Sequence, residues 1–315
     1  MPTFGLGLAA LGRPGYINLG HSADLHAGRD VATMRAHTHT VLSAAYQHGL
    51  RYFDAARSYG LAEDFLGTWL RAHAIPPAEV TIASKWGYTY TANWQIDAAV
   101  HEVKDHTLPV LQRQWAESQQ HLAPYLRLYQ IHSATLDSGV LTNPAVLGEL
   151  ARLKASGIDI GLSLSGPHQL DTLRAALAIT VAGQPLFSAV QATWNLLERS
   201  VEPGLIDAHA AGWRVIIKEA VANGRLTPRN PDPALAPLHA QAARLHTSID
   251  ALALAAVLAR PWVSVVLSGA TTVAQLESNL AARTLAYDDE AEAALTALIE
   301  PAEVYWRTRS QLPWN

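Results

Sequence analysis

The sequence of 315 residues contains no cysteine. This absence excludes disulfide bonds, thiolate metal sites and cysteine catalysis, and it gives no indication of the redox compartment. The chain also lacks an apolar run long enough to cross a membrane, which takes about 20 residues as a helix. Its first residues, 1–7, have neither the basic start nor the long apolar stretch of a signal peptide. We therefore expect a cytoplasmic protein with no membrane partner.

A large excess of either charge is also missing. The net charge is −4 and only 16% of the residues are charged, so we expect no nucleic-acid partner. Hydrophobic residues make up 49% of the chain, which is enough to form a large core. The sequence shows no internal repeat, no low-complexity linker and no break in composition. These features predict one domain over residues 1–315.

What the sequence does contain is a regular alternation of strand-like and helix-like segments. Such alternation is typical of a parallel sheet, and eight strand–helix units favour a closed barrel. No Gly-x-Gly-x-x-Gly motif opens a helix, so an open dinucleotide-binding sheet is not supported. We predict an α/β fold, a single (β/α)8 TIM barrel with an extra C-terminal helix near 288–299 and a polar tail. The predicted strands are residues 4–11, 51–54, 80–84, 126–131, 158–162, 187–191, 213–217 and 263–267.

Four polar side chains follow three successive strands of this predicted barrel. Asp54 and Tyr59 lie at and just beyond the second strand, Lys85 follows the third, and His132 follows the fourth. The C-terminal ends of parallel barrel strands meet at one face, where catalytic residues gather. We therefore expect these four side chains to form one site.

The residue types in this set suit proton transfer to an oxygen atom. A tyrosine has a pKa of about 10, and a nearby ammonium lowers that value by stabilising the phenolate. A carboxylate would fix the ammonium, and a histidine would orient a carbonyl oxygen. The sequence shows no activated serine, no second carboxylate for glycoside chemistry and no cluster of metal ligands. Protonating a carbonyl oxygen is useful only when its carbon is attacked, and a nicotinamide hydride is the expected attacker.

Other polar and aromatic residues leave alternatives open. Trp86 and Tyr88 either line a substrate pocket at the barrel mouth or pack the long loop that follows the third strand. His37 and His39 form an H-x-H pair inside a predicted helix, where we expect no metal site. Two other classes of function remain as alternatives: a non-catalytic barrel that senses nicotinamide, and a metal-dependent barrel hydrolase.

Several motifs, in one consistent order, closely resemble those of the aldo-keto reductases. This resemblance implies a (β/α)8 barrel that moves a hydride between a nicotinamide and an aldehyde, ketone, alcohol or sugar hemiacetal. By the same resemblance, Tyr59 is the general acid/base, Lys85 and Asp54 tune its pKa, and His132 orients the substrate oxygen. The motifs are residues 53–60, Ser84-Lys85, residues 130–132, Val190-Gln191, residues 194–198, residues 267–270 and residues 275–280.

The resemblance also implies a set of cofactor contacts. Ser163 and Gln191 match residues that hold the nicotinamide carboxamide, although Leu164 stands where the family often has asparagine. Thr271 stands where many relatives have an arginine or lysine for the 2′-phosphate. Family frequency alone favours NADP(H), with NAD(H) as the alternative. The implied cofactor residues are Ser163, Gln191, Lys218, Asn223, Gly224, Leu226, Gly269, Thr271, Gln275 and Asn279.

Overall fold

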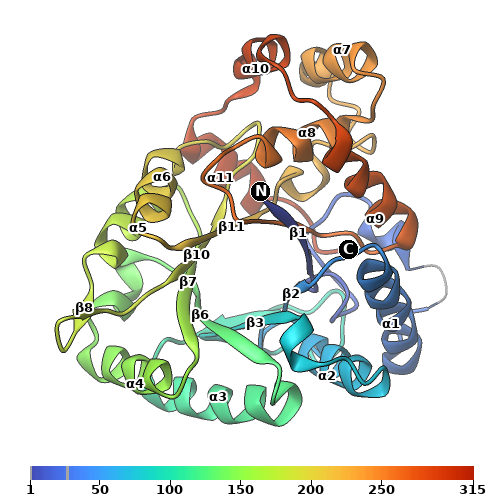
Figure 1. Cartoon of the computed structure of the whole chain (residues 1–315). Coiled ribbons are helices and arrows are strands. Elements are labelled where there is room, and N and C mark those ends of the chain that lie inside the picture. Colours follow the sequence, from blue (N-terminus) through green and yellow to red (C-terminus); the bar gives the residue numbers. More distant parts are fainter. Residues whose placement is uncertain (1, 26–27) are drawn as a thin grey trace.

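The structure is a computed structural model that describes residues 2–25 and 28–315. Eight parallel strands close into a barrel in the order β1-β12-β11-β10-β7-β6-β3-β2 (Figure 1). This arrangement confirms the predicted (β/α)8 barrel. The strands are β1 (Thr3–Gly7), β2 (Tyr52–Asp54), β3 (Thr81–Trp86), β6 (Leu126–Ala134), β7 (Asp159–Leu164), β10 (Ala189–Thr193), β11 (Arg214–Lys218) and β12 (Val265–Ser268).

Helices surround the barrel, and side chains at their first residues cap several of them (Figure 1). Asn143 accepts hydrogen bonds from the backbone N–H groups of Ala145 and Val146 at the start of α4, and Asp30 caps α1 in the same way. Gly49 ends the α1 turn with a φ of 82°, a conformation that glycine adopts without strain. The surrounding helices are α1 (Val31–Gln47), α2 (Ala62–Ala72), α3 (Leu108–Leu122), α4 (Pro144–Ala155), α5 (Gln169–Leu177), α6 (Glu202–Ala210), α8 (Ile249–Leu258) and α9 (Val273–Leu280).

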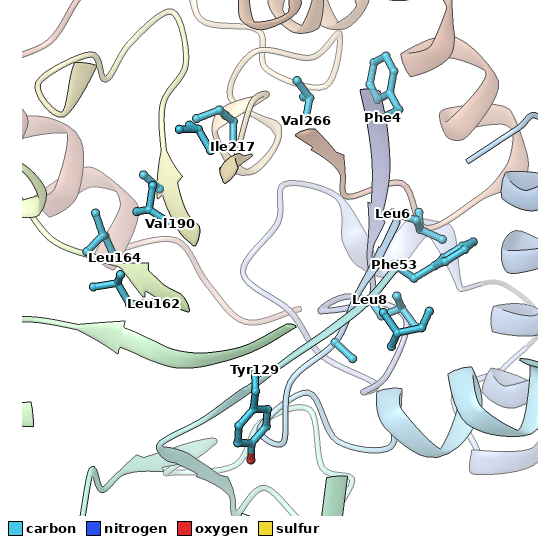
Figure 2. Close-up of a cluster of buried hydrophobic side chains, with 14 of the residues drawn as sticks. Phe4, Leu6, Leu8, Phe53, Tyr129, Leu162, Leu164, Val190, Ile217 and Val266 are labelled. Atoms are coloured by element: carbon cyan, nitrogen blue, oxygen red, sulfur yellow. The ribbon is translucent and has the colours of Figure 1, made fainter. Parts of the chain in front are cut away.

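The strands alternate between two apolar layers because successive side chains point to opposite faces. The larger layer lies between the strands and the helices, and Figure 2 shows part of it, including Phe53, Tyr129 and Val190. Burial of each large apolar side chain in such a layer contributes about 1.5–3 kcal/mol. A second cluster fills the barrel interior with the residues that alternate with these: Tyr52, Ala83, Leu128, Ala189, Ile216, Val265 and Leu267.

The regions outside the eight repeated units differ most from the sequence prediction. The connection 86–107 contains an antiparallel hairpin of β4 (Tyr88–Tyr90) and β5 (Glu102–Lys104). The tail forms a helix, α11 (Ala302–Ser310), because Tyr305 and Trp306 are buried in a third apolar cluster, separate from the two barrel layers. Strand β1 ends at Gly7, short of residue 11, because the chain turns back there and Leu11 N donates to Leu8 O.

Further helices and a hairpin lie outside the eight repeated units. Helix α7 (Ala236–Arg244) packs beside α10 (Asp289–Leu295) outside the ring of helices (Figure 1). A short hairpin pairs β8 (Thr180–Val181) with β9 (Gln184–Pro185). None of the helices within residues 2–25 and 28–315 is both long and apolar enough to span a membrane. The single-domain organisation stays a prediction.

Candidate active site

The polar residues of the site lie two positions after residues of the inner apolar layer. Because a strand repeats every two residues, each of these polar side chains also points into the barrel, one level closer to its C-terminal mouth. This spacing brings side chains from several strands to one place. The pairs are Tyr52 and Asp54, Ala83 and Lys85, Ala189 and Gln191, and Ile216 and Lys218; His132 follows Leu128 by two such steps.

Asp54, Lys85 and Tyr59 form one connected group at the base of this mouth. The Lys85 ammonium is fully buried and donates to the Asp54 carboxylate, to Ala55 O at 3.1 Å and to Tyr59 Oη at 3.3 Å. The other carboxylate oxygen of Asp54 accepts from Gln191 Nε2 at 2.9 Å. A buried charge pair of this kind needs such additional hydrogen bonds to offset its desolvation. The structure thus brings together the acid, the amine and the phenol named from the sequence.

The pKa of Tyr59 is shifted in the direction opposite to the one that the sequence argument predicted. Burial, and then the Asp54 carboxylate, raise the pKa of Tyr59 well above its ordinary value, and Arg13 offsets this only in part. We expected the ammonium of Lys85 to lower that pKa. The Lys85 ammonium is shared between Asp54 and Tyr59 Oη, so Asp54 offsets part of the stabilisation that Lys85 can give to a phenolate. The phenol therefore keeps its proton, as a general acid must.

His132 lies beside the tyrosine as a neutral imidazole. Burial, and then the positive charges of Lys85 and Lys218, hold its pKa well below the ordinary value. Its Nδ1 is 3.4 Å from Ser58 Oγ, and its ring meets the Tyr59 ring edge-on at a centroid distance of 5.4 Å. A neutral imidazole next to a protonated phenol offers two hydrogen-bonding groups to one substrate oxygen.

A cavity of about 410 Å³ connects this group to the ends of other strands. Asp54, Tyr59 and His132 line it, and so do Gly269 and Asn279, which follow β12. Six of the residues predicted to hold a cofactor line this cavity: Ser163, Gln191, Lys218, Asn223, Gly269 and Asn279. The buried Oδ1 atom of Asn223 has no hydrogen-bond partner within the described residues. An elongated polar molecule would fit this space and could supply that partner, as a nicotinamide dinucleotide would.

Several predicted site residues do not reach the cavity. Leu226 is fully buried in an apolar cluster. Gly224 has a φ of 89° and allows its own loop, after β11, to pack closely against the loop that carries Leu19, after β1. A Cβ at Gly224 would come within 3.0 Å of Leu19 Cβ. Thr271 is fully buried, and Gln275 contacts it through its side-chain oxygen. Thr271 and Gln275 thus belong to a separate cluster that does not line the cavity.

The alternation along the strands corrects the prediction for Trp86. Lys85 points into the barrel, so Trp86 points outward, where it is fully buried and packs near His106. It belongs to the core and lines no substrate pocket, whereas Tyr88 does line the cavity. Leu164 is buried in the outer layer for the same reason, and Ser165 lines the cavity instead.

Lys218 belongs to a charged network that the sequence only partly indicated. Its ammonium donates to Thr193 Oγ1 at 2.8 Å, and burial lowers its pKa to about 8. The neighbouring Glu219 is bound by the guanidinium of Arg309, with Nε 2.9 Å from Oε1. Burial alone would raise the pKa of Glu219, but Arg309 and Lys218 outweigh it and bring the pKa to about 2. Arg309 comes from α11, which the sequence did not predict as a helix.

The cavity mouth contains an arginine that the sequence analysis missed. Arg13 is 3% exposed, and its guanidinium donates to Ser58 O at 3.1 Å and to Glu102 Oε2 at 3.0 Å. It also lies 4.8 Å from the Trp314 ring, which lines the cavity from the tail. Arg13 follows the first strand, so the strand-end argument that identified Lys85 could have identified it too.

The H-x-H pair makes contacts that account for it without a metal. His37 Nε2 lies close to Thr271 O, and His39 Nε2 is 3.0 Å from Phe65 O. Within the described parts of the chain, no group of three or more His, Cys, Asp or Glu side chains is arranged to hold a metal ion.

The chain matches known proteins over most of its length. Residues 19–300 match the model of the aldo/keto reductase family. An L-galactose dehydrogenase from Arabidopsis thaliana is 28% identical over 277 residues, which are 82% of this chain and 83% of that protein. The holo form of aldo-keto reductase AKR11C1 from Bacillus halodurans has a TM-score of 0.70 at 20% identity, covering 95% of this chain and 92% of its own.

The crystal structure of a putative aldo-keto reductase from Pseudomonas aeruginosa has a TM-score of 0.62 at 22% identity, covering 94% of this chain and 90% of that chain. At this identity the two structural matches support the barrel fold alone. The family match covers far more than half of the chain and includes the segments that carry Asp54, Tyr59, Lys85 and His132. The chain therefore belongs to the aldo/keto reductase family.

Proposed function

We propose that this protein is a nicotinamide-dependent oxidoreductase in which Tyr59 is the general acid/base for a carbonyl/alcohol pair. The observation that carries the proposal is the buried Asp54–Lys85–Tyr59 group beside neutral His132 at one end of a long cavity. Membership of the family supports an oxidoreductase activity on carbonyl or alcohol substrates. The tyrosine's role and the identity of the substrate go beyond that match.

When bound, the nicotinamide cofactor supplies a hydride to a carbonyl carbon or accepts one from an alcohol carbon. Tyr59 Oη gives its proton to the carbonyl oxygen in reduction. In oxidation the phenol must first lose its own proton, and the phenolate then takes the proton of the substrate hydroxyl. Lys85 stabilises the phenolate that remains after reduction. His132 holds the same oxygen by donating from Nε2, with Ser58 Oγ donating to its Nδ1. Ser163, Gln191, Lys218 and Asn223 are the residues that would hold the cofactor.

The mouth of the cavity favours a hydroxylated substrate. Arg13, Glu102 and Glu219 line it together with the aromatic rings of Tyr88 and Trp314. Arg13 pairs with Glu102 and Glu219 pairs with Arg309, but Arg13 Nε is buried without a hydrogen-bond partner within the described residues. A hydroxylated sugar can supply such a partner, whereas an apolar aldehyde cannot. The similarity to a plant L-galactose dehydrogenase points the same way. We therefore propose the oxidation of a sugar hemiacetal, with a cytoplasmic location still only a prediction.

The test is a panel of aldoses, aldehydes and ketones followed by nicotinamide absorbance with both cofactors in both redox states. Tyr59→Phe should lower kcat by about 10²–10⁴-fold, because it removes the proton donor, while cofactor affinity stays unchanged. Tyr46→Phe is the matched control, since that exposed hydroxyl donates to Glu79 far from the cavity. Near-normal turnover of Tyr59→Phe would sink the proposal. Cofactor binding without turnover on any substrate would favour a nicotinamide-sensing barrel.

A further inference from the structure

The proposed oxidation needs a Tyr59 phenol that has lost its proton. Burial and the Asp54 carboxylate oppose this loss, because both raise the pKa of Tyr59 well above its ordinary value. Lys85 favours the phenolate, but its ammonium is shared with Asp54. His132 beside the ring is neutral and adds no charge. A second positive charge near the phenol would therefore help it to ionise.

Arg13 provides such a charge from the loop that follows β1. Its guanidinium carbon lies 5.4 Å from the centre of the Tyr59 ring, and the Lys85 ammonium lies 4.8 Å from the same point. The guanidinium donates to Ser58 O at 3.1 Å, on the residue directly before Tyr59. This hydrogen bond holds Arg13 in place beside the phenol. Because Arg13 is buried, water screens its charge only weakly.

Glu102, on β5, is the counter-charge of Arg13. Its Oε2 lies 3.0 Å from Arg13 Nη1, and its side chain is 25% exposed, compared with 4% for that of Arg13. Water therefore weakens the field of the carboxylate more than that of the guanidinium. In agreement with this, Arg13 lowers the pKa of Tyr59 more than Glu102 raises it. The pair thus acts on the phenol with a net positive effect.

The other titratable groups of the cavity act less strongly on this phenol than Arg13 does. Glu219 raises its pKa only weakly, because Arg309 binds that carboxylate at 2.9 Å and Lys218 Nζ lies 3.9 Å from it. Burial raises the pKa of Tyr16 and the pKa of Tyr88, so both keep their protons and stay uncharged at neutral pH. Arg13 and Glu102 are therefore the charges at the mouth whose removal should be felt most at the phenol.

We propose that Arg13 is a positioning residue of the oxidation, whose charge stabilises the Tyr59 phenolate, and that Glu102 limits this effect. The role rests on the proposed function, because it concerns the base of that reaction. The phenol proton passes to solvent, and the phenolate then takes the substrate hydroxyl proton as the hydride leaves the carbon for the nicotinamide. Arg13 exchanges no proton itself, since a guanidinium stays charged over the accessible pH range.

The pH dependence of kcat for oxidation tests this role, because it reports the ionisation of the enzyme with substrate bound. Arg13→Gln should move the profile to higher pH by about one unit, so that oxidation below the apparent pKa becomes up to about tenfold slower. Glu102→Gln should move the profile to lower pH and make oxidation faster under the same conditions. Arg13→Lys keeps the charge and should recover most of the wild-type profile. A merely structural role would not be recovered, because lysine lacks the planar fork of the guanidinium.

Arg29→Gln is the matched control. It removes one cation from the same loop, where Arg29 Nη1 donates to Pro14 O at 3.1 Å, and it should leave the profile unchanged. Titration of the tyrosinate absorbance follows the same ionisation without turnover, when each protein is compared with its own Tyr59→Phe form. The shifts in Arg13→Gln and Glu102→Gln should again have opposite signs.

Shifts of the same sign in the two variants, or no shift in either, overturn the role of Arg13. If Arg13→Gln does not fold, Glu102→Gln decides the question, because its profile must move to lower pH. Opposite shifts in the absorbance titration without turnover on any substrate overturn only the proposed function. Turnover that is lost in Tyr59→Phe but shows an unshifted profile in the folded variants overturns only the role of Arg13.

Discussion

Two polar groups of the molecule are built in different ways. The proposed catalytic end of the cavity (Asp54, Tyr59, Lys85 and His132) is set by inward-facing positions on β2, β3 and β6, with Tyr59 held just after β2. The loop cluster beyond the cavity (Asp24, Arg229, Thr271 and Gln275) depends on loops that hold one another through hydrogen bonds. Strand ends are fixed by the whole barrel, whereas loop positions depend on a few local contacts. Changes at the catalytic end should therefore affect the whole fold, and changes in the loop cluster should stay local.

The largest effect should come from breaking the buried charge pair at the catalytic end. Lys85→Met leaves the Asp54 carboxylate buried without its cation, so we expect a loss of about 3–5 kcal/mol in the free energy of unfolding. The kcat value should fall by about 10²–10⁴-fold. Chemical denaturation and steady-state kinetics measure the two effects. Adding Asp54→Asn to Lys85→Met should restore most of the stability and none of the activity. An inactive double variant that stays as unstable as the single one would contradict the charge-pair argument.

A smaller effect is expected from the network that supports the catalytic end from outside the barrel. Glu63 is 1% exposed and accepts hydrogen bonds from Arg57, Ser84 and Ser118. Glu63→Ala leaves these donors unpaired and should lower the free energy of unfolding by about 3 kcal/mol. Glu117→Ala is the control, because this more exposed partner of Arg57 should cost less than about 1 kcal/mol. Equal losses in the two variants would show that burial of the network does not matter.

The sequence predicted that Asp54, Tyr59, Lys85 and His132 would lie together, because the two-residue strand period and the residue types agree there. The same two-residue period would have placed Trp86 outside the barrel, but the predicted strand ended at residue 84 and hid that alternation. In the loop cluster beyond the cavity, the resemblance named only Thr271 and Gln275, and the sequence did not indicate Asp24 or Arg229. Asp24 and Arg229 lie 205 residues apart in the sequence, and loops have no period that indicates which way a side chain points. Arg309 was missed for a related reason, since its helix is defined by packing of Tyr305 and Trp306.

Lys218 also lines the cavity, and its charge should make cofactor binding depend on pH. Its pKa is about 8, and the pyrophosphate of a cofactor bound against Lys218, as proposed, would raise that pKa by stabilising the ammonium. Affinity should therefore be constant below pH 8 and fall by up to about tenfold per pH unit above it. Glu219, with a pKa of about 2, stays ionised throughout. Calorimetry of NAD⁺ binding between pH 6.5 and 9.5 tests this, and Lys218→Met should remove the slope.

Protein stability should change with pH in the opposite direction from this affinity. The folded pKa of Lys218 lies below its ordinary value of 10.5, so between about pH 8 and 10.5 the unfolded chain binds more protons than the folded one. The contribution of Lys218 to stability then rises with pH over that window. If the loss of cofactor affinity merely followed unfolding, the affinity and the free energy of unfolding would fall together as the pH rises. That result would argue against a contact between Lys218 and the cofactor.

The smallest effect should come from the C-terminal tail, which lines the cavity through Trp314 but is part of neither the catalytic end nor the loop cluster. Trp314 stacks on His101 at a centroid distance of 3.8 Å and lies 4.8 Å from the Arg13 guanidinium. Asn315 holds it in place by exchanging backbone hydrogen bonds with Tyr16 at 3.1 and 3.2 Å. Trp314→Ala should raise the KM for the substrate a few-fold, with kcat and cofactor affinity nearly unchanged, because it removes one wall of the mouth and no reacting group. Trp314→Phe keeps an aromatic wall and should recover most of the loss. A fall in kcat equal to the fall in kcat/KM would instead place Trp314 in the transition state, and the division between a rigid catalytic end and an adjustable mouth would have to be redrawn.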